Sequence, residues 1–233
     1  MSRTPLQIGF LVFPNITQLD MTGPLQVLSR VPGAKVHVIW KSLDPVMSDA
    51  GVALVPNMTM ERCPKLDVIC VPGGGGQIEL MDDAETIAFV RRQGLGARYV
   101  TSVCTGALVL GAAGLLKGYK ATTHWNSMDQ LAMFGATPVE ARVCIDGNRV
   151  TGGGVTAGID FGLTLAAELA GRKAAEKIQL GLEYDPQPPF ASGSPRSASE
   201  EVLTEVRQQV APMLEKRAAA SRRAAERLAS LAD

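Results

Sequence analysis

The stretch YVTSVCTGALVL, residues 99–110, indicates the fold class because it joins a buried strand to a helix of small residues. Tyr99 to Val103 has the length and β-branched content of a strand, and the residues from Gly106 onward favour a helix. Comparable apolar runs alternate with amphipathic helical patterns such as 83–93. These runs cover residues 6–13, 36–40 and 68–71. Continuous apolar strands separated by helices predict an α/β fold with a mainly parallel sheet covered on both faces.

The rest of the chain extends this pattern in three parts. An α/β body over residues 1–184 is predicted to carry a β-hairpin at 45–60 added to the main sheet, further strands at 141–145 and 149–151, and helices at 157–169 and 172–182. Residues 185–198 are rich in Pro, Ser and Gly and form a connector. Residues 199–233 form a C-terminal helical extension, which Pro212 should kink or interrupt. This helix packs across the body or over a partner subunit, and the second arrangement would make a homodimer.

Composition excludes several classes of protein. The chain has 233 residues, of which 46% are hydrophobic and 20% charged, so it is expected to form one large domain, or one domain plus an appendage. Lys plus Arg and Asp plus Glu both number 23, which leaves no net charge to attract nucleic acid or anionic lipid. The apolar run at 6–13 is too short to span a membrane and lacks a signal-peptide cleavage site. We expect a cytoplasmic protein with no nucleic-acid or membrane partner.

Cys104 is the residue most suited to chemistry. It stands where the strand ends and the helix begins, and the helix N-terminus is expected to lower the pKa of its thiol and favour the thiolate. The alternative is a buried cysteine that acts as a small hydrophobic residue. The chain contains four cysteines, and Cys63, Cys70 and Cys144 all have the sequence context of structural residues.

A run of glycines follows the strand at 68–71. Gly73, Gly74 and Gly75 are expected at the carboxyl edge of the sheet, where open α/β folds bind ligands and where glycine lets peptide N–H groups approach a reacting atom. The run fits neither a P-loop nor a dinucleotide fingerprint, so a neutral or transiently anionic ligand is preferred. A second glycine cluster at 152–154 suits ligand contact and tight packing equally well.

Asp20 and His124 are the candidate acid–base groups. By itself Asp20 fits a turn or a capping residue before the helix opened by Pro24, but its loop follows the first strand and would overhang Cys104 if that strand is central. His124 fits either a structural residue or the base of a Cys-His hydrolase. No grouping of His, Cys and carboxylates has the spacing of a metal site, so no metal is expected.

Four motifs together resemble the ThiJ/PfpI superfamily, and the similarity spans roughly residues 6 to 183. The stretches at 13–14, 19–24 and 182–190 resemble in particular its isocyanide hydratase branch. The motifs are Asp67-Val-Ile-Cys-Val-Pro-Gly-Gly, Ser102-Val-Cys-Thr-Gly-Ala, Ala121-Thr-Thr-His-Trp and Thr151-Gly-Gly-Gly.

This resemblance implies a flavodoxin-like three-layer sandwich, a homodimer and no cofactor. Cys104 matches the family nucleophile and Asp20 its acid–base carboxylate, a position at which most members carry Glu. The implied activity is hydration of isocyanides to N-formamides through a covalent thioimidate. Thr105 would hold Asp20 or water, and N–H groups of the 73–75 loop and of Thr105 would stabilise charge on the adduct.

Three other functions are alternatives to isocyanide hydration for a sequence with these motifs. The ligand-sensing halves of AraC-like regulators share the motifs around Cys104 and His124, but they append a DNA-binding domain, and only 49 residues without net positive charge follow Tyr184 here. The intracellular protease branch places His directly after its cysteine, where this chain has Thr105. An oxidative-stress or glyoxalase-like role stays open, since a reactive cysteine is open to sulfinate formation.

Overall fold

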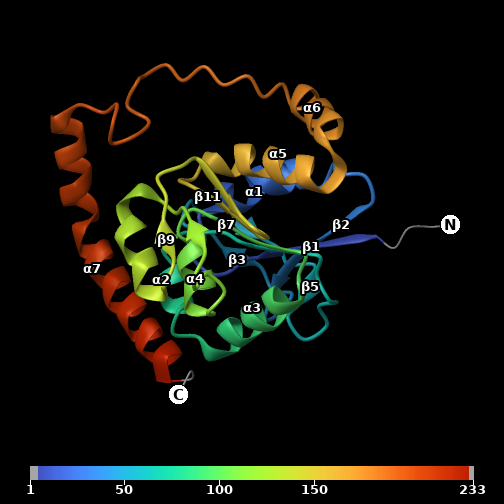
Figure 1. Ribbon diagram of the computed structural model, residues 1–233, viewed down its shortest axis with the longest axis horizontal. Coiled ribbons are helices and arrows are strands. Elements are labelled where there is room, and N and C mark those ends of the chain that lie inside the picture. The colour runs from blue at the N-terminus through green and yellow to red at the C-terminus, as the bar shows by residue number, and fades with distance from the viewer. Residues whose placement is uncertain (1–4, 231–233) are drawn as a thin grey trace.

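The computed structural model describes residues 5–230 and shows a seven-stranded sheet between two layers of helices (Figure 1). Across the sheet the strands run in the order β10 (Val143–Asp146), β11 (Arg149–Gly152), β7 (Tyr99–Val103), β6 (Val68–Val71), β1 (Leu6–Leu11), β2 (Ala34–Trp40) and β5 (Met58–Thr59). Only the pairing of β10 with β11 is antiparallel. The prediction of a flavodoxin-like sandwich with a mainly parallel sheet is confirmed.

The helices form two layers because the central strands are apolar on both faces. One layer contains α1 (Gln18–Leu28), α5 (Ala157–Ala170) and α6 (Arg172–Gly181), which pack on one another. The other contains α2 (Gln77–Leu80), α3 (Ala84–Gly96), α4 (Gly106–Ala112) and the 3₁₀ helix η1 (Trp125–Phe134). Every residue of β6 is buried between these layers, as expected for a central parallel strand.

The predicted hairpin forms, but it does not join the main sheet as expected. β3 (Val46–Met47) and β4 (Ala53–Leu54) pair antiparallel in a separate two-stranded sheet, and only β5, which follows them, extends the main sheet. A further short pair, β8 (Lys120–Ala121) with β9 (Thr137–Pro138), was not predicted. Strands of two residues carry too little periodicity to be recognised in a sequence.

Of the two effects predicted for Pro212, the interruption is wrong, because the terminal helix α7 (Glu200–Ser230) continues through it, and the kink stays a prediction. Pro212 and Gln208, one turn earlier, are both exposed, so water can satisfy the carbonyl group that loses its helical partner. The helix packs against α2, α4 and η1 of its own chain. The predicted contact with a partner subunit stays a prediction. The outer bounds predicted for the body and the extension, residues 1 and 233, lie outside the described residues.

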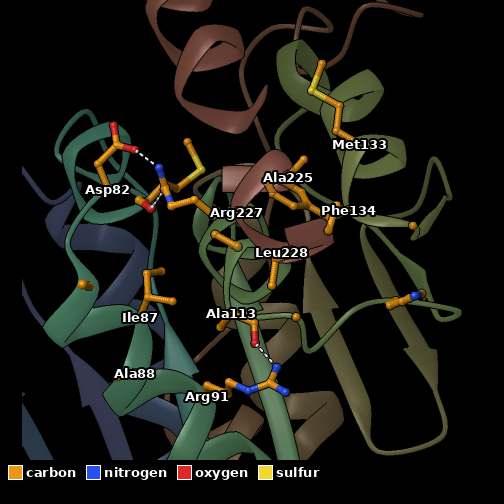
Figure 2. Close-up of a pocket in the computed structure, with 17 residues that line it drawn as sticks. Asp82, Ile87, Ala88, Arg91, Ala113, Met133, Phe134, Ala225, Arg227 and Leu228 are labelled. Atoms are coloured by element: carbon orange, nitrogen blue, oxygen red, sulfur yellow. Dashed lines mark hydrogen bonds and ion pairs between the residues drawn. The ribbon is translucent and has the colours of Figure 1, made fainter. Parts of the chain in front are cut away.

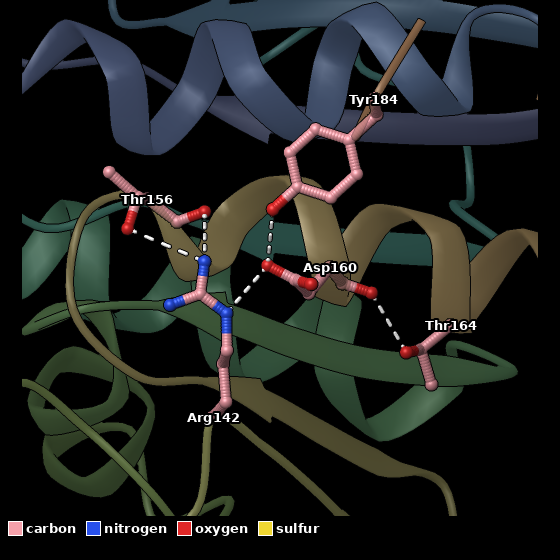
Figure 3. A network of polar contacts seen from close by, with 5 residues as sticks. All are labelled: Arg142, Thr156, Asp160, Thr164 and Tyr184. Atoms are coloured by element: carbon pink, nitrogen blue, oxygen red, sulfur yellow. Dashed lines mark hydrogen bonds and ion pairs between the residues drawn. The ribbon is translucent and has the colours of Figure 1, made fainter. Parts of the chain in front are cut away.

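A polar cluster fixes the point where the chain leaves the body (Figure 3). Arg142 Nε donates to Asp160 Oδ2 at 2.6 Å, and the Tyr184 hydroxyl donates to the same oxygen at 2.8 Å. Arg142 Nη2 also donates to the Thr156 carbonyl at 3.1 Å. The cluster ties Tyr184 to α5 and to Arg142, the residue before β10. Residues 185–199 then run to α7 without helix or strand.

A groove of about 860 Å³ separates α3, α4 and the end of α7 (Figure 2). Ile87, Ala113, Phe134 and Leu228 are among its lining residues, and neither Cys104 nor Asp20 borders it. Within residues 5–230, no helix combines the length and apolar character that crossing a bilayer requires.

Candidate active site

The order of the parallel strands brings the sequence-predicted residues together. β1, β6 and β7 are neighbours and run in the same direction, so the segments after their carboxyl ends meet at one edge of the sheet. Asp20 follows β1, Gly73 follows β6 and Cys104 follows β7. Asp20 lies in the first turn of α1, which already begins at Gln18, so the expected loop before a helix opened by Pro24 is wrong. Asp20 is fully buried and Cys104 is 5% exposed.

Cys104 occupies a strained turn between β7 and α4. Its φ of 56° lies in the left-handed region, which is uncommon for a residue other than glycine. The Cys104 N–H is shared between the carbonyls of Gly152 at 3.1 Å and Gly153 at 2.8 Å. Its carbonyl accepts a hydrogen bond from Thr123 Oγ1 at 2.7 Å. These contacts hold the conformation that carries the side chain out of the strand, as in a nucleophile elbow.

Asp20 and Thr105 are held by the glycine loop. Asp20 Oδ2 accepts a hydrogen bond from Gly73 N at 3.0 Å, and Thr105 Oγ1 accepts one from Gly74 N at 3.2 Å. A Cβ at Gly73 would lie 2.6 Å from both N and Oγ1 of Thr105 and 2.8 Å from Asp20 Oδ2. The three segments therefore converge on a point where only hydrogen fits. Thr105 thus contacts the glycine loop directly.

Gly74 and Gly75 have different surroundings. Gly74 has a φ of 133°, and a Cβ there would meet Thr17 N at 2.4 Å and Asn15 O at 2.6 Å. Gly75 is exposed, and a Cβ there would meet nothing closer than Asn15 O at 4.0 Å. The structure groups Gly73 and Gly74 with the buried site and leaves Gly75 outside it.

Burial shifts the acidities of both candidate catalytic groups. Burial raises the pKa of Asp20 to about 7, against the opposing effects of its contacts with Cys104 and with Gly73 N. Burial and the Asp20 carboxylate raise the pKa of Cys104 well above its usual value, while Thr105 N–H and Arg217 act to lower it. The expected lowering of the thiol pKa is therefore wrong, because desolvation and a like charge outweigh the end of a short helix.

The two acids behave as a coupled pair. Between the loss of the first and of the second proton, one proton is shared by the Asp20 carboxyl group and the Cys104 thiol. Asp20 Oδ1 is buried and has no hydrogen-bond partner within residues 5–230. These pKa directions keep the shared proton on Cys104 at rest. Its transfer to Asp20 gives a carboxylic acid beside a thiolate, a proton donor next to a nucleophile, and this arrangement suits addition to a substrate that must also gain a proton.

His124 caps a helix. Its Nδ1 accepts a hydrogen bond from Asn126 N at 3.4 Å at the start of η1. Burial lowers its pKa, which favours the neutral imidazole that accepts this bond. The contact matches the structural interpretation of His124.

The other cysteines lie apart from the turn at Cys104. Cys70 is fully buried within β6, and burial raises its pKa to about 12. Burial also raises the pKa of Cys63, to about 11, and that of Cys144 in β10. Within residues 5–230, no three His, Cys, Asp or Glu side chains form a group able to hold a metal ion.

Sequence reasoning missed two polar residues of the buried region, Gln77 and Arg217. Gln77 is fully buried and Arg217 is 3% exposed. One signal was available for Arg217. It continues the helical spacing of the apolar residues Val210 and Leu214, so a charged residue stands on the face that packs against the body.

The fold and the strained cysteine define the class: an α/β protein with a cysteine on a strand-to-helix turn beside a buried carboxyl group. The chain belongs to the DJ-1/PfpI family, whose sequence pattern matches residues 7–168. It is similar to an isonitrile hydratase of Pseudomonas putida, with 57% identity over 96% of this chain and 98% of that protein.

Two further comparisons agree with the fold. A crystal structure of a ThiJ/PfpI family protein from Pseudomonas syringae superposes with a TM-score of 0.91 at 51% identity, over 93% of this chain and 90% of that one. The transcriptional regulator GbdR of Pseudomonas aeruginosa is 30% identical over 79% of this chain but only 52% of its own length. The similarity to the hydratase therefore extends over more of both proteins than the similarity to the regulator.

Proposed function

We propose that this protein is an isocyanide hydratase, which adds water to the terminal carbon of an isocyanide and releases an N-formamide. The observation that carries this proposal is the buried pair of Asp20 and Cys104, whose side chains are in contact and can hold a single proton between them. An isocyanide is uncharged, and its terminal carbon needs both a nucleophile and a proton. The extended similarity to an isonitrile hydratase supports the same substrate class.

In the first half of the reaction, the Cys104 thiolate forms a bond from Sγ to the terminal carbon. The proton of Asp20 goes to the same carbon, whose lone pair forms the new C–H bond. One carbon–nitrogen π pair becomes the nitrogen lone pair, and the product is a covalent thioimidate on Cys104. Asp20 is left as a carboxylate, the form that acts as a base.

In the second half, water adds to the thioimidate carbon and Asp20 relays one water proton to the nitrogen. The tetrahedral adduct carries a hydroxyl group and a sulfur substituent. Asp20 takes the hydroxyl proton as the carbonyl forms, the C–S bond breaks, and Cys104 leaves as a thiolate. The balance is one isocyanide and one water consumed, one N-formamide formed, and Asp20 protonated again.

Backbone groups of the same edge complete the proposed machinery. Thr105 N–H lies close to the Asp20 carboxylate around Gly73 and acts on the Cys104 sulfur, so it is placed to stabilise charge there. Gly74 N–H holds the Thr105 hydroxyl oxygen, and the hydroxyl proton stays free for Asp20 or water. We retain Gly73 and Gly74 as the loop that shapes the substrate site, and Gly75 as the exposed end of that loop.

The cellular setting is proposed from the same resemblance. We propose a homodimer that acts in the cytoplasm on a small-molecule isocyanide without a cofactor. A sedimentation measurement of the purified protein tests the oligomeric state, and turnover after exhaustive dialysis against chelator tests independence from a metal.

The experiment that tests the function uses an aryl isocyanide and mass spectrometry. The wild-type protein is expected to produce the formamide and to show a substrate-mass adduct on the peptide that contains Cys104. Cys104→Ala is expected to lose both. Cys144→Ala, which removes a thiol from β10, serves as the matched control and should retain both. Turnover by Cys104→Ala at more than a few percent of the wild-type rate would refute the assignment of Cys104 as the nucleophile.

A further inference from the structure

The terminal helix places a buried arginine in the region of the active site. Arg217 is 3% exposed, and its guanidinium donates from Nε to Gln77 Oε1 at 3.0 Å and from Nη1 to Ser127 Oγ at 3.1 Å. Its Nη2 contacts Met213 Sδ at 3.3 Å. Within residues 5–230, none of these partners is a carboxylate. A buried charge without a counter-charge is unfavourable, so the surroundings must supply negative charge in another way.

The first neutral partner belongs to the segment that holds Thr105. Gln77 begins α2 directly after the glycine loop, and Gly74 of that loop donates to Thr105 Oγ1 at 3.2 Å. A guanidinium only donates hydrogen bonds, so Gln77 must turn its Oε1 toward Arg217. Its Nε2 is then buried without a partner among the described residues. Arg217 thus fixes the orientation of an amide that retains free N–H groups.

The second neutral partner belongs to the segment that holds Cys104. Ser127 lies in the first turns of η1, a few residues after Thr123. Thr123 Oγ1 donates to the Cys104 carbonyl at 2.7 Å. Arg217 therefore connects two chain segments that each contact the strained turn.

The charge of Arg217 distinguishes the two acids of the pair. Burial and Asp20 raise the pKa of Cys104, whereas the Thr105 N–H and the positive charge of Arg217 lower it. The pKa of Asp20 is set by burial, Cys104, Gly73 N–H and Asp49. A cation that acts on the sulfur stabilises the thiolate, and so opposes the burial and the like charge that hold the shared proton on Cys104. The Cys104 thiolate is in turn an anion that acts on Arg217.

We propose that Arg217 is a positioning residue of the active site, which ties α7 to the two segments around Cys104 and brings a buried positive charge to them. The catalytic consequence rests on the proposed function, but the effect on the thiol requires no substrate. Helix α7 lies beyond residues 7–168, which match the family pattern. Arg217 therefore brings to this site a cation from outside the residues that match the family pattern.

The test compares three variants of the full-length protein. Arg217→Met removes the charge and keeps a long, unbranched side chain. Arg217→Lys keeps a charge but loses the guanidinium group that donates from several nitrogens. Arg222→Met removes an exposed charge from the same helix and is the control. The rate of alkylation of Cys104 by iodoacetamide is followed across pH by mass spectrometry of its peptide, beside kcat/KM for an aryl isocyanide.

Loss of a nearby cation raises a thiol pKa by about one unit, so Arg217→Met is expected to slow alkylation at neutral pH about tenfold and to lower kcat/KM at least as much. Arg217→Lys should lie between Arg217→Met and the wild type, and Arg222→Met should match the wild type. An Arg217→Met protein that melts like the wild type and has an unchanged alkylation profile would overturn the proposal.

A second variant keeps the proposal testable if Arg217→Met does not fold. Gln77→Glu places a carboxylate on the guanidinium and cancels its charge while the helix stays packed. It is expected to slow alkylation in the same way, and an unchanged profile would again overturn the proposal. A wild-type protein that hydrates no isocyanide would refute the proposed function alone, because the alkylation comparison would still report on Arg217.

Discussion

Gly73→Ala tests whether the glycine loop sets the distance between Asp20 and Thr105. The backbone of Gly73 lies outside the left-handed region, so alanine fits its conformation and only the added Cβ matters. That atom would lie 2.6 Å from Thr105 N and Oγ1 and 2.8 Å from Asp20 Oδ2, where ordinary contacts begin at 3.4 Å. These groups must therefore separate by on the order of half an ångström, and overpacking of this kind costs about 1–3 kcal/mol of folding free energy.

The same displacement should affect turnover more than stability. Small errors in the placement of catalytic groups cost about 10²-fold in rate, so we expect kcat/KM of Gly73→Ala to fall by about that factor. Gly75→Ala is the matched control, because a Cβ there would meet nothing closer than Asn15 O at 4.0 Å. Thermal melting and initial rates on an aryl isocyanide measure the two effects. If Gly73→Ala and Gly75→Ala behave alike in both assays, the loop does not set this distance.

Three further predictions concern protons and the terminal helix. First, kcat/KM is expected to rise with pH through about 7, where burial places the pKa of Asp20, because the site is active only after the pair has lost its first proton; a rate profile that is flat across neutral pH would contradict this. Second, the folded protein binds the Asp20 proton more tightly than the unfolded chain, so its stability falls as pH rises from 3.8 to about 7, between the unfolded and folded pKa values of Asp20. The Asn side chain of Asp20→Asn cannot ionise, so this variant should lose turnover. Above neutral pH it should be more stable than the wild type by up to roughly 4 kcal/mol, at about 1.4 kcal/mol per pKa unit. Denaturant unfolding at two pH values should show that this difference vanishes in acid. Third, Pro212→Ala restores a helical hydrogen bond within α7 and should raise the free energy of unfolding by about 1–3 kcal/mol, with unchanged or lower stability as the opposing result.

The sequence predicted those parts of the structure that depend on local pattern. Strands β1, β6 and β7 have apolar runs of ordinary length, and the turn at Cys104 has a clear change from strand to helix. The position of Asp20 was predicted only on the assumption that β1 is central, which the sheet order confirms.

Other features depend on long-range contacts that a sequence pattern does not contain. The pKa of Cys104 is raised by burial and by Asp20, a residue far away in the chain. These two effects outweigh the lowering of the thiol pKa that the helix N-terminus alone would cause. The contacts of Arg217 with Gln77 and Ser127 depend on where α7 docks. Helix α7 continues through Pro212 because the affected turn faces water, and exposure is a property of the tertiary structure.

The order of the central strands also has a consequence for biogenesis. Asp20 leaves the ribosome well before Cys104, and the two meet only after β6 has been laid down between β1 and β7. Contacts between residues so distant in the chain form late in folding. A partly synthesised or misregistered molecule thus holds an ordinary thiol, and the reactivity of Cys104 becomes a chemical marker for completed assembly of the sheet.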